Sequence, residues 1–324
     1  MRPPRHPHRP WWLLALILWL PALHGAETVR VGVLQFGTVH WLLDVMREDR
    51  LAEQQGVALE VMPLGSKNAT SVALQGDAVD LIVSDWLWVS RQRDEGRDYT
   101  FAPHSVAAGA LLVRPDSGID DLKGLAGRRL GVAGGPVDKS WLLLRAYARR
   151  ELGRDLAADP TFGAPPLLNQ LMLRGELPAV LNFWHYGARL EAAGMRPLVT
   201  VKEMLHGLGV SEPLPLVGWV FRQSWATAHP AAIAGFLRAA ELAQQRLATS
   251  NAEWERLRPL MKAEDEATFE ALRDGYRAGI PAGGGDTAAH TAAQVFRILA
   301  REGGPDLVGN ATELAPGTFW EAAE

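Results

Sequence analysis

Short apolar runs alternate with amphipathic stretches through the first third of the chain. The runs at 28–34, 57–62 and 79–83 are rich in valine and leucine, which is typical of strands. The stretches 41–51 and 72–76 between them have the apolar spacing of helices. This β-α-β-α-β order predicts parallel strands with helices on the faces of the sheet.

The stretch 114–152 is the centre of the pattern. A short apolar strand at 129–133 is broken by Gly134-Gly135-Pro136, and a helix with an apolar face follows over 141–152. A strand, a glycine turn and a helix start place free backbone N–H groups at the carboxyl edge of a sheet, where ligands bind in open α/β proteins. The alternative is an ordinary βα unit with no ligand.

The rest of the chain continues with strands and then changes to helices. The pattern predicts strands at 107–113, 175–181, 196–201 and 216–221, a helix at 167–174, a loop-like stretch at 203–215, and final helices at 230–248, 251–261, 264–278 and 287–302.

This order predicts two α/β lobes. The first is discontinuous and takes residues 26–110 and 217–324, including the C-terminal helices, and the second takes 111–216. The chain would cross between them twice, in the strands near 107–113 and 216–221. A single large doubly wound domain is the alternative organisation.

The N-terminal residues 1–25 have the pattern of an export signal. Three arginines precede the apolar run WWLLALILWL at 11–20, and small residues follow at Gly25 and Ala26. The apolar core is short for a membrane span, so we expect a cleavable signal peptide, with an uncleaved anchor as the alternative.

Composition narrows the class of protein further. Cleavage after residue 25 leaves 30 basic against 37 acidic residues, a formal charge of −7. No basic run or basic overall charge points to nucleic acid. The chain has no cysteine, which excludes disulfides, thiol ligands and a lipid-modified cysteine anchor. An exported, unanchored protein of this kind is expected in a bacterial periplasm.

No signature of catalysis is present. The sequence has no GxSxG, HExxH, P-loop or GxGxxG motif, and its histidines are scattered without metal-ligand spacing. We therefore expect neither an enzyme nor a bound cofactor or metal.

Four segments carry a resemblance to a known family. They are LQGDAVDLIVSD (74–85), SGIDDLKGLAGRRLGVAGG (117–135), LRGELPAVLNFW (173–184) and FRQSWATAHPAAIAGFLRAAELA (221–243). Their order and spacing over nearly all of the mature chain resemble the periplasmic substrate-binding proteins of ABC importers, in the group for nitrate, taurine, aliphatic sulfonates and thiamine-precursor pyrimidines.

The resemblance implies the type II periplasmic-binding-protein fold. Each lobe would hold a mostly parallel sheet with flanking helices, and a two-stranded hinge would let the lobes close on a small molecule like a Venus flytrap. The closed form would dock on a permease in the inner membrane, and such proteins are usually monomers. Relatives that make a thiamine pyrimidine rely on a cysteine-rich segment, which this chain lacks.

The resemblance and the positions of the strand ends together predict the ligand contacts. These lie in loops at the carboxyl ends of strands: Gly37, Thr38, Trp41, Ser66, Asn68, Asp85, Trp86, Gly135, Asp138, Lys139, Ser140, Asn182, Trp184, His185 and Trp219. Several have a purely structural alternative. Asp85 and Asp138 fit helix caps, and the tryptophans and His185 fit core packing.

The predicted contacts also bear on the chemistry of the ligand. Two carboxylates, Asp85 and Asp138, with Lys139 alone on the basic side, suit a sulfonate poorly. Carboxylates and tryptophans favour a flat neutral or cationic, heteroaromatic ligand. A second function stays open, a periplasmic accessory protein that uses the same fold to bind a partner such as a quinoprotein dehydrogenase. That function predicts a poorly formed cleft and an exposed apolar patch.

Overall fold

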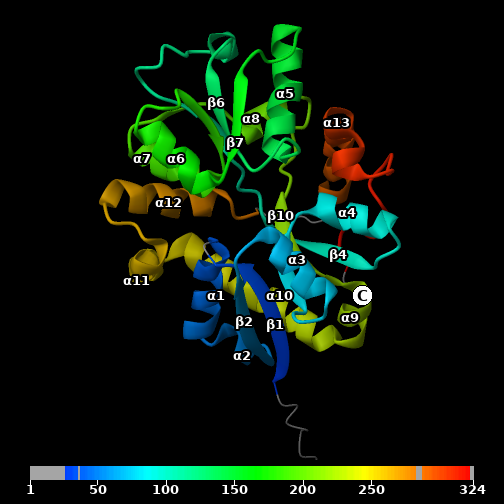
Figure 1. Ribbon diagram of the computed structural model, residues 1–324. Coiled ribbons are helices and arrows are strands. Elements are labelled where there is room, and N and C mark those ends of the chain that lie inside the picture. Colours follow the sequence, from blue (N-terminus) through cyan, green and yellow to red (C-terminus); the bar gives the residue numbers. More distant parts are fainter. Residues whose placement is uncertain (1–25, 36, 282–286, 322–324) are drawn as a thin grey trace, which may run out of the picture.

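Two five-stranded sheets form the framework of the protein. The computed structural model describes residues 26–35, 37–281 and 287–321 (Figure 1), so the predicted signal peptide at 1–25 lies outside the described residues. We call the first sheet with its helices lobe 1 and the second sheet with its helices lobe 2. Whether the lobes are separate domains with the boundaries 110/111 and 216/217 stays a prediction.

The sheet of lobe 1 has the order β2-β1-β3-β10-β4. Its strands are β1 (Glu27–Leu34), β2 (Val57–Leu64), β3 (Leu81–Ser84), β4 (Tyr99–Ser105) and β10 (Val217–Arg222). The first three pair in parallel, as the β-α-β-α-β pattern predicts, and β1 matches β2 along its whole length. β10 is antiparallel to both of its neighbours because the chain returns from lobe 2 in the opposite direction.

The sheet of lobe 2 repeats this plan in the order β7-β6-β8-β5-β9. Its strands are β5 (Ala110–Val113), β6 (Arg129–Ala133), β7 (Asp159–Gly163), β8 (Ala179–Asn182) and β9 (Arg196–Thr200). β5, which arrives from lobe 1, is antiparallel to β8 and β9, and the other pairs are parallel. Both sheets are therefore mixed, with the crossing strand reversed in each.

Two short segments join the lobes. Residues 106–109 lead from β4 to β5, and residues 210–216 lead from lobe 2 to β10. The second segment lies beside the end of β4, where the Leu216 N–H donates to the Ser105 carbonyl at 3.1 Å. Apart from that contact with the end of β4, both connecting segments lack regular strand structure.

Helices cover the sheets of both lobes. Lobe 1 carries α1 (Val39–Glu48), α2 (Leu51–Gln54), α3 (Lys67–Gln75), α4 (Trp86–Asp94), α9 (Gln223–Ala228), α10 (Pro230–Thr249) and α11 (Asn251–Met261). Lobe 2 carries η1 (Leu122–Leu125), α5 (Lys139–Leu152), α6 (Pro165–Leu173), α7 (Trp184–Ala192) and α8 (Val201–Gly207). Most of these helices follow a strand directly, so their N-termini lie near the carboxyl ends of the strands.

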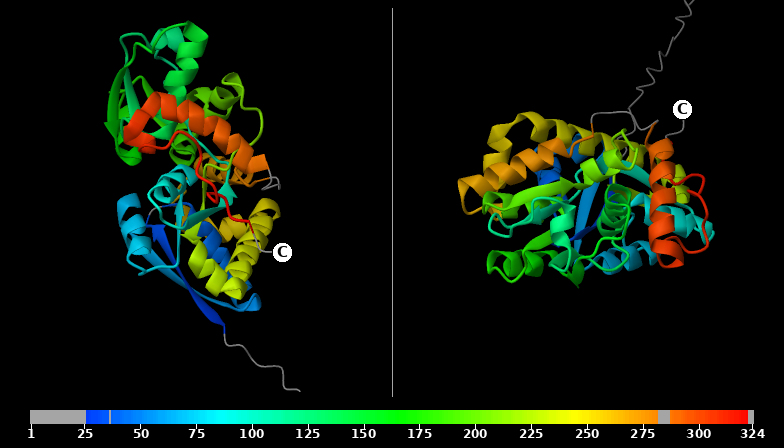
Figure 2. Two further views of the ribbon diagram at one scale, coloured as in Figure 1. Left: turned by 90° about the vertical axis from the view of Figure 1, so that its right-hand side faces the viewer. Right: turned by 90° about the horizontal axis from the view of Figure 1, so that it is seen from above.

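The last two helices touch both lobes. α12 (Glu266–Ala278) packs against α7 of lobe 2 and α11 of lobe 1, and α13 (Ala288–Val308) packs against α5 of lobe 2 and α4 of lobe 1. Figure 2 shows α13, in orange and red, beside both lobes. One hydrophobic cluster runs from Trp86 in lobe 1 through Phe296 of α13 to Leu142 in lobe 2. These two helices therefore join the lobes, and their assignment to lobe 1 stays a prediction.

The prediction of a loop at 203–215 is wrong in its first part. Residues 201–207 form α8, because Thr200 and Glu203 make a capping box and Met204 and Leu205 are buried. The glycines and prolines that follow this helix gave the whole stretch the composition of a loop. Six further elements, α2, α4, β4, β7, α7 and α9, were not predicted as separate elements.

Replacing Gly109, in the segment that leads from β4 to β5, tests how closely the backbone is packed there. A Cβ atom there would lie 2.0 Å from the Asn182 carbonyl oxygen, so Gly109→Ala must displace backbone. We expect a loss of about 3 kcal/mol in the free energy of unfolding, the upper end of overpacking costs. Gly65→Ala is the control, because a Cβ there meets nothing within 4 Å. Equal urea-unfolding curves for the two variants would contradict this packing.

Candidate functional site

An ion-pair cluster joins the two lobes at the carboxyl ends of their strands. Asp85 directly follows β3 in lobe 1, and Lys139 begins the helix after β6 in lobe 2. Asp85 Oδ2 accepts from Lys139 Nζ at 3.0 Å and from Lys67 Nζ, on α3 of lobe 1, at 2.6 Å. The sequence predicted Asp85 and Lys139 as contacts and missed Lys67, which lies between the predicted Ser66 and Asn68.

The charges in this cluster stabilise one another. The Asp85 side chain is 5 % exposed, and burial by itself raises its pKa. The charges of Lys139 and Lys67, with their hydrogen bonds, outweigh burial and hold the pKa of Asp85 well below its usual range. Burial likewise lowers the pKa of Lys139, but the charges of Asp85 and Asp138 raise it above its ordinary value overall. Asp85 and Lys139 are therefore both ionised at neutral pH.

Asp85 and Asp138 also cap helices, which is the structural role that the sequence offered as an alternative to ligand binding. Asp85 Oδ1 accepts from the Trp88 N–H at 2.9 Å, and Asp138 Oδ1 accepts from the Ser140 N–H at 2.9 Å. Burial raises the pKa of Asp138, so this carboxylate loses its charge more readily than Asp85. Gly134 precedes this cap with φ of +90°, a conformation that glycine adopts without strain.

Aromatic rings of α1, α7, α11 and α12 pack against one another across the two lobes. Trp41 of α1 packs edge-on against Trp184 of α7 at 6.2 Å and against Trp254 of α11 at 5.8 Å. Tyr276 of α12 contacts all three tryptophans. These aromatic contacts therefore connect helices of lobe 1 with helix α7 of lobe 2.

Two buried polar atoms beside these rings lack a hydrogen-bond partner within the described ranges. They are the Tyr276 hydroxyl and His185 Nδ1. Burial, with a smaller effect of Arg189, lowers the pKa of His185 to about 4, so the imidazole is neutral at physiological pH. The sequence predicted His185 but not Tyr276, because a tyrosine on an amphipathic helix gives no signal that separates a site from a core.

Three predicted contacts are buried within the lobes. Trp86 and Trp219 are 0 % and 1 % exposed. Asn182 is 1 % exposed and donates to the Pro165 carbonyl at 3.1 Å and to Asn169 Oδ1 at 2.8 Å. These three side chains present almost no surface to a solute in the described conformation, and the buried Trp86 Nε1 has no hydrogen-bond partner within the described residues. A role of the three in ligand binding stays a prediction.

The other predicted contacts lie at or near the starts of α1, α3 and α5. Ser66 is exposed and caps α3 by accepting from the Ala69 N–H at 3.1 Å, and Asn68 is exposed beside it. Gly37 and Thr38 are half-buried at the start of α1. Gly135 and Ser140 are half-buried near Lys139. A role of these residues in ligand binding stays a prediction.

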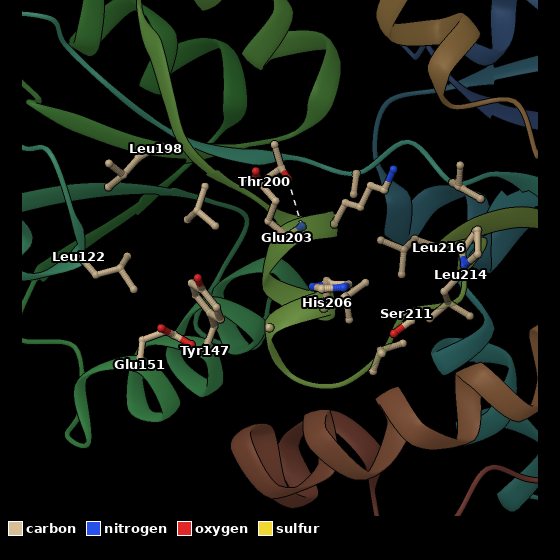
Figure 3. Close-up of a pocket in the computed structure, with 18 of the residues that line it drawn as sticks. Leu122, Tyr147, Glu151, Leu198, Thr200, Glu203, His206, Ser211, Leu214 and Leu216 are labelled. Carbon is tan, nitrogen blue, oxygen red and sulfur yellow. Dashed lines mark hydrogen bonds between the residues drawn. The ribbon is translucent and has the colours of Figure 1, made fainter.

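The protein has two pockets among its described residues that lie away from the predicted ligand contacts. The larger, of about 1130 Å³, lies on lobe 2 and the two connections (Figure 3), and the smaller, of about 550 Å³, lies between the end of α4 and the C-terminal tail. Neither is lined by a predicted contact. Within the described residues, no group of three or more His, Asp or Glu side chains is placed to hold a metal, and no helix has the length and apolar character of a membrane span.

Comparison with solved structures identifies the fold. The chain is similar to the periplasmic aliphatic sulphonate binding protein SsuA from Escherichia coli, with 16% identity, a TM-score of 0.70, and 92% of this chain and 93% of that chain covered. It is similar to the alkanesulfonate-binding protein SsuA from Xanthomonas axonopodis pv. citri bound to MOPS, with 16% identity, a TM-score of 0.68, and 91% and 99% covered.

The periplasmic nitrate-binding protein NrtA from Synechocystis PCC 6803 is a more distant neighbour. It has 13% identity, a TM-score of 0.56, and 77% of this chain and 69% of that chain covered. No protein-family model matches the chain, and no curated protein matches it in sequence. The two-lobed fold of the periplasmic binding proteins, expected from the resemblance, is thereby confirmed.

Replacing Asp85 with asparagine tests the ion-pair cluster. The variant keeps an acceptor for the Trp88 N–H but removes the charge between the lysines. We expect a loss of about 2 kcal/mol at neutral pH, less than for a fully buried pair because the Lys67 side chain is 55% exposed. Since the folded-state pKa of Asp85 is lowered, this difference is fully present above the unfolded-state pKa of about 3.9 and shrinks as the pH falls below it.

Urea unfolding at neutral pH and in acid measures both effects. Asp121→Asn is the control, because Asp121 caps η1 through the Gly124 N–H and forms no ion pair with a lysine among the described residues. It should cost less than about 0.5 kcal/mol at either pH. An Asp85→Asn difference that is absent at neutral pH, or that grows in acid, would contradict the cluster.

Proposed function

We propose that the protein is the solute-binding component of an ABC import system. It holds a small organic molecule between its lobes and delivers it to a permease in the inner membrane. The observation that carries the proposal is the meeting of Lys67, which follows β2 of lobe 1, and Lys139, which follows β6 of lobe 2, on Asp85 at the carboxyl end of β3. Ligands of open α/β sheets bind at such edges.

The cluster favours a solute with an acidic group. Two ammonium groups share one oxygen of Asp85, and each has further N–H donors for a second anion. Asp85 is already paired with two lysines, which weakens the argument from the sequence for a cationic solute, although Asp138 still lies near Lys139. The neighbours in fold are named as binding aliphatic sulphonate, alkanesulfonate and nitrate, all of which are anions.

The body of the solute would lie toward the aromatic rings. Trp184 is half-buried, and the Tyr276 hydroxyl and His185 Nδ1 beside it have no partner within the described residues. An aromatic or apolar body with a polar substituent fits these groups. Export to the periplasm with a cleaved signal peptide, a monomeric state and the absence of a chemical step are parts of the same proposal.

A second function, the accessory protein that binds a partner through this fold, has one specific observation in its favour. Trp41, Trp184 and Tyr276 occupy part of the space between the lobes, and neither described pocket is lined by a predicted contact residue. That function predicts that no small solute stabilises the protein.

Thermal unfolding with a panel of solutes tests the proposed function. The panel holds small carboxylates and sulfonates, neutral heteroaromatic compounds and organic cations. We expect an acidic member to stabilise the protein, by about 2.7 kcal/mol at 100 times its Kd. Lys139→Gln should weaken that solute at least about tenfold, because one of two charge-assisted contacts is lost.

Lys123→Gln is the matched control, since Lys123 is an exposed lysine of lobe 2 outside the cluster. It should bind the solute as the unmodified protein does. Stabilisation by cations alone would overturn the acidic solute. No stabilisation by any member, together with no small molecule in native mass spectra of the purified protein, would favour the accessory protein.

A further inference from the structure

A large groove lies on lobe 2 beside the two connections. It has a volume of about 1130 Å³, and its walls come from η1, α5, β9, α8, residues 210–216 and the end of α12 (Figure 3). None of its lining residues belongs to the proposed solute site. The groove is therefore a separate feature of the molecule.

The interior of the groove is apolar. Leu122, Leu152, Leu198 and Leu216 contribute side chains from four different parts of the chain. All four are only partly exposed and pack against or within the hydrophobic core. This surface suits the apolar side chains of an occupant.

The rim of the groove is acidic. Five carboxylates line it (Asp120, Asp121, Glu151, Glu203 and Glu212), against two lysines, Lys123 and Lys202. Asp120 pairs with Arg196, and Asp121 and Glu203 are engaged in helix caps. Glu151 and Glu212 make no hydrogen bond or ion pair within the part of the chain that the structure describes, so their charges are available to an occupant.

One corner of the groove has the chemistry of a cation site. The Tyr147 ring lies against Gly207, where a Cβ atom would come within 2.4 Å of Cε2. Glu151 lies one helical turn after Tyr147 on α5, and both line this corner together with Glu203 (Figure 3). Burial and then the charges of Glu151 and Glu203 raise the pKa of Tyr147. An aromatic ring flanked by carboxylates suits a guanidinium or ammonium group.

We propose that this groove docks a basic, amphipathic segment of a partner protein. Leucine-like side chains of the segment would cover the apolar interior, and its Lys or Arg side chains would meet Glu151, Glu203 and Glu212. The volume exceeds the roughly 300–1,000 Å³ of usual small-molecule pockets, which favours a peptide over a small cation. The acidic rim disfavours nucleic acid and anionic lipid surfaces.

The docked segment would touch lobe 2 and both connections at once. Val106 and Ala108 of the first connection and Leu214 of the second line the groove together with α8. The site therefore spans the parts of the chain that must bend when the lobes move.

Fluorescence anisotropy with labelled peptides tests the docking. One peptide repeats Leu-Lys-Lys-Leu, and its counterpart replaces each Lys with Glu. The basic peptide should bind, with an affinity that falls as salt rises, and the acidic one should bind at least about tenfold more weakly. The double variant Glu151→Lys/Glu212→Lys should weaken the basic peptide at least about tenfold.

The control is Glu60→Lys/Glu264→Lys, which reverses two exposed charges of lobe 1 outside the groove. It should bind the basic peptide nearly as the unmodified protein does, and equal thermal unfolding of both double variants shows that they are folded. Equal loss of binding in the two double variants would overturn the proposal, as would equal binding of the two peptides. Binding of spermidine as tight as that of the basic peptide would assign the groove to a small cation instead, which also overturns it.

Discussion

The carboxylate of Asp85 and its two lysines are the interaction on which the relation between the lobes depends. Asp85 is buried, and an unpaired buried charge is costly, so its position requires counter-ions. Lys67 comes from the same lobe and Lys139 from the other. The ordinary features of the βα units place these groups, since Asp85 caps the helix after β3 and Lys139 is the first residue of the helix after β6.

The C-terminal helices add a second constraint. α13 contributes Phe296 to the hydrophobic cluster that spans both lobes, and its Glu302 pairs with Arg149 of α5 at 2.5 Å. On the other side, Arg189 of α7 donates to the Met261 carbonyl at 2.6 Å, and α12 packs on α7. These contacts of the protein itself thus hold the two lobes together in the described conformation. To bind between the lobes, a solute must replace some of these contacts between protein residues with contacts between the protein and the solute.

Much of the fold follows from local sequence. The valine-rich runs of lobe 1 and the strand Arg129–Ala133 predicted their strands because alternation and apolar runs report burial in a sheet directly. α8 was missed because its capping box depends on two side chains, Thr200 and Glu203, while the glycines and prolines beyond it dominate the composition. β5 and β10 are antiparallel to their neighbours because the chain enters each sheet from the other lobe. A local pattern of apolar residues does not indicate the direction from which a strand arrives.

The candidate site was only partly predictable for the same reason. Asp85 and Lys139 follow strands, so their place at the carboxyl edges was visible in the sequence. Their pairing with each other and with Lys67 joins residues far apart in the chain, and without it Asp85 was interpreted as a carboxylate free to meet a cation. Trp86 and Trp219 show the limit of a composition argument, because a tryptophan at a strand end packs inward as readily as it meets a ligand.

The distance between the lobes in the absence of solute is the most direct test of this account. The chain has no cysteine, so Val72→Cys on α3 and Leu173→Cys on α6, both exposed, can carry spin labels, one on each lobe. Double electron–electron resonance should give one narrow distance for the solute-free protein, and a longer, broader distribution when Asp85→Asn is added. Identical distributions with and without Asp85→Asn would show that this ion-pair cluster does not hold the lobes together.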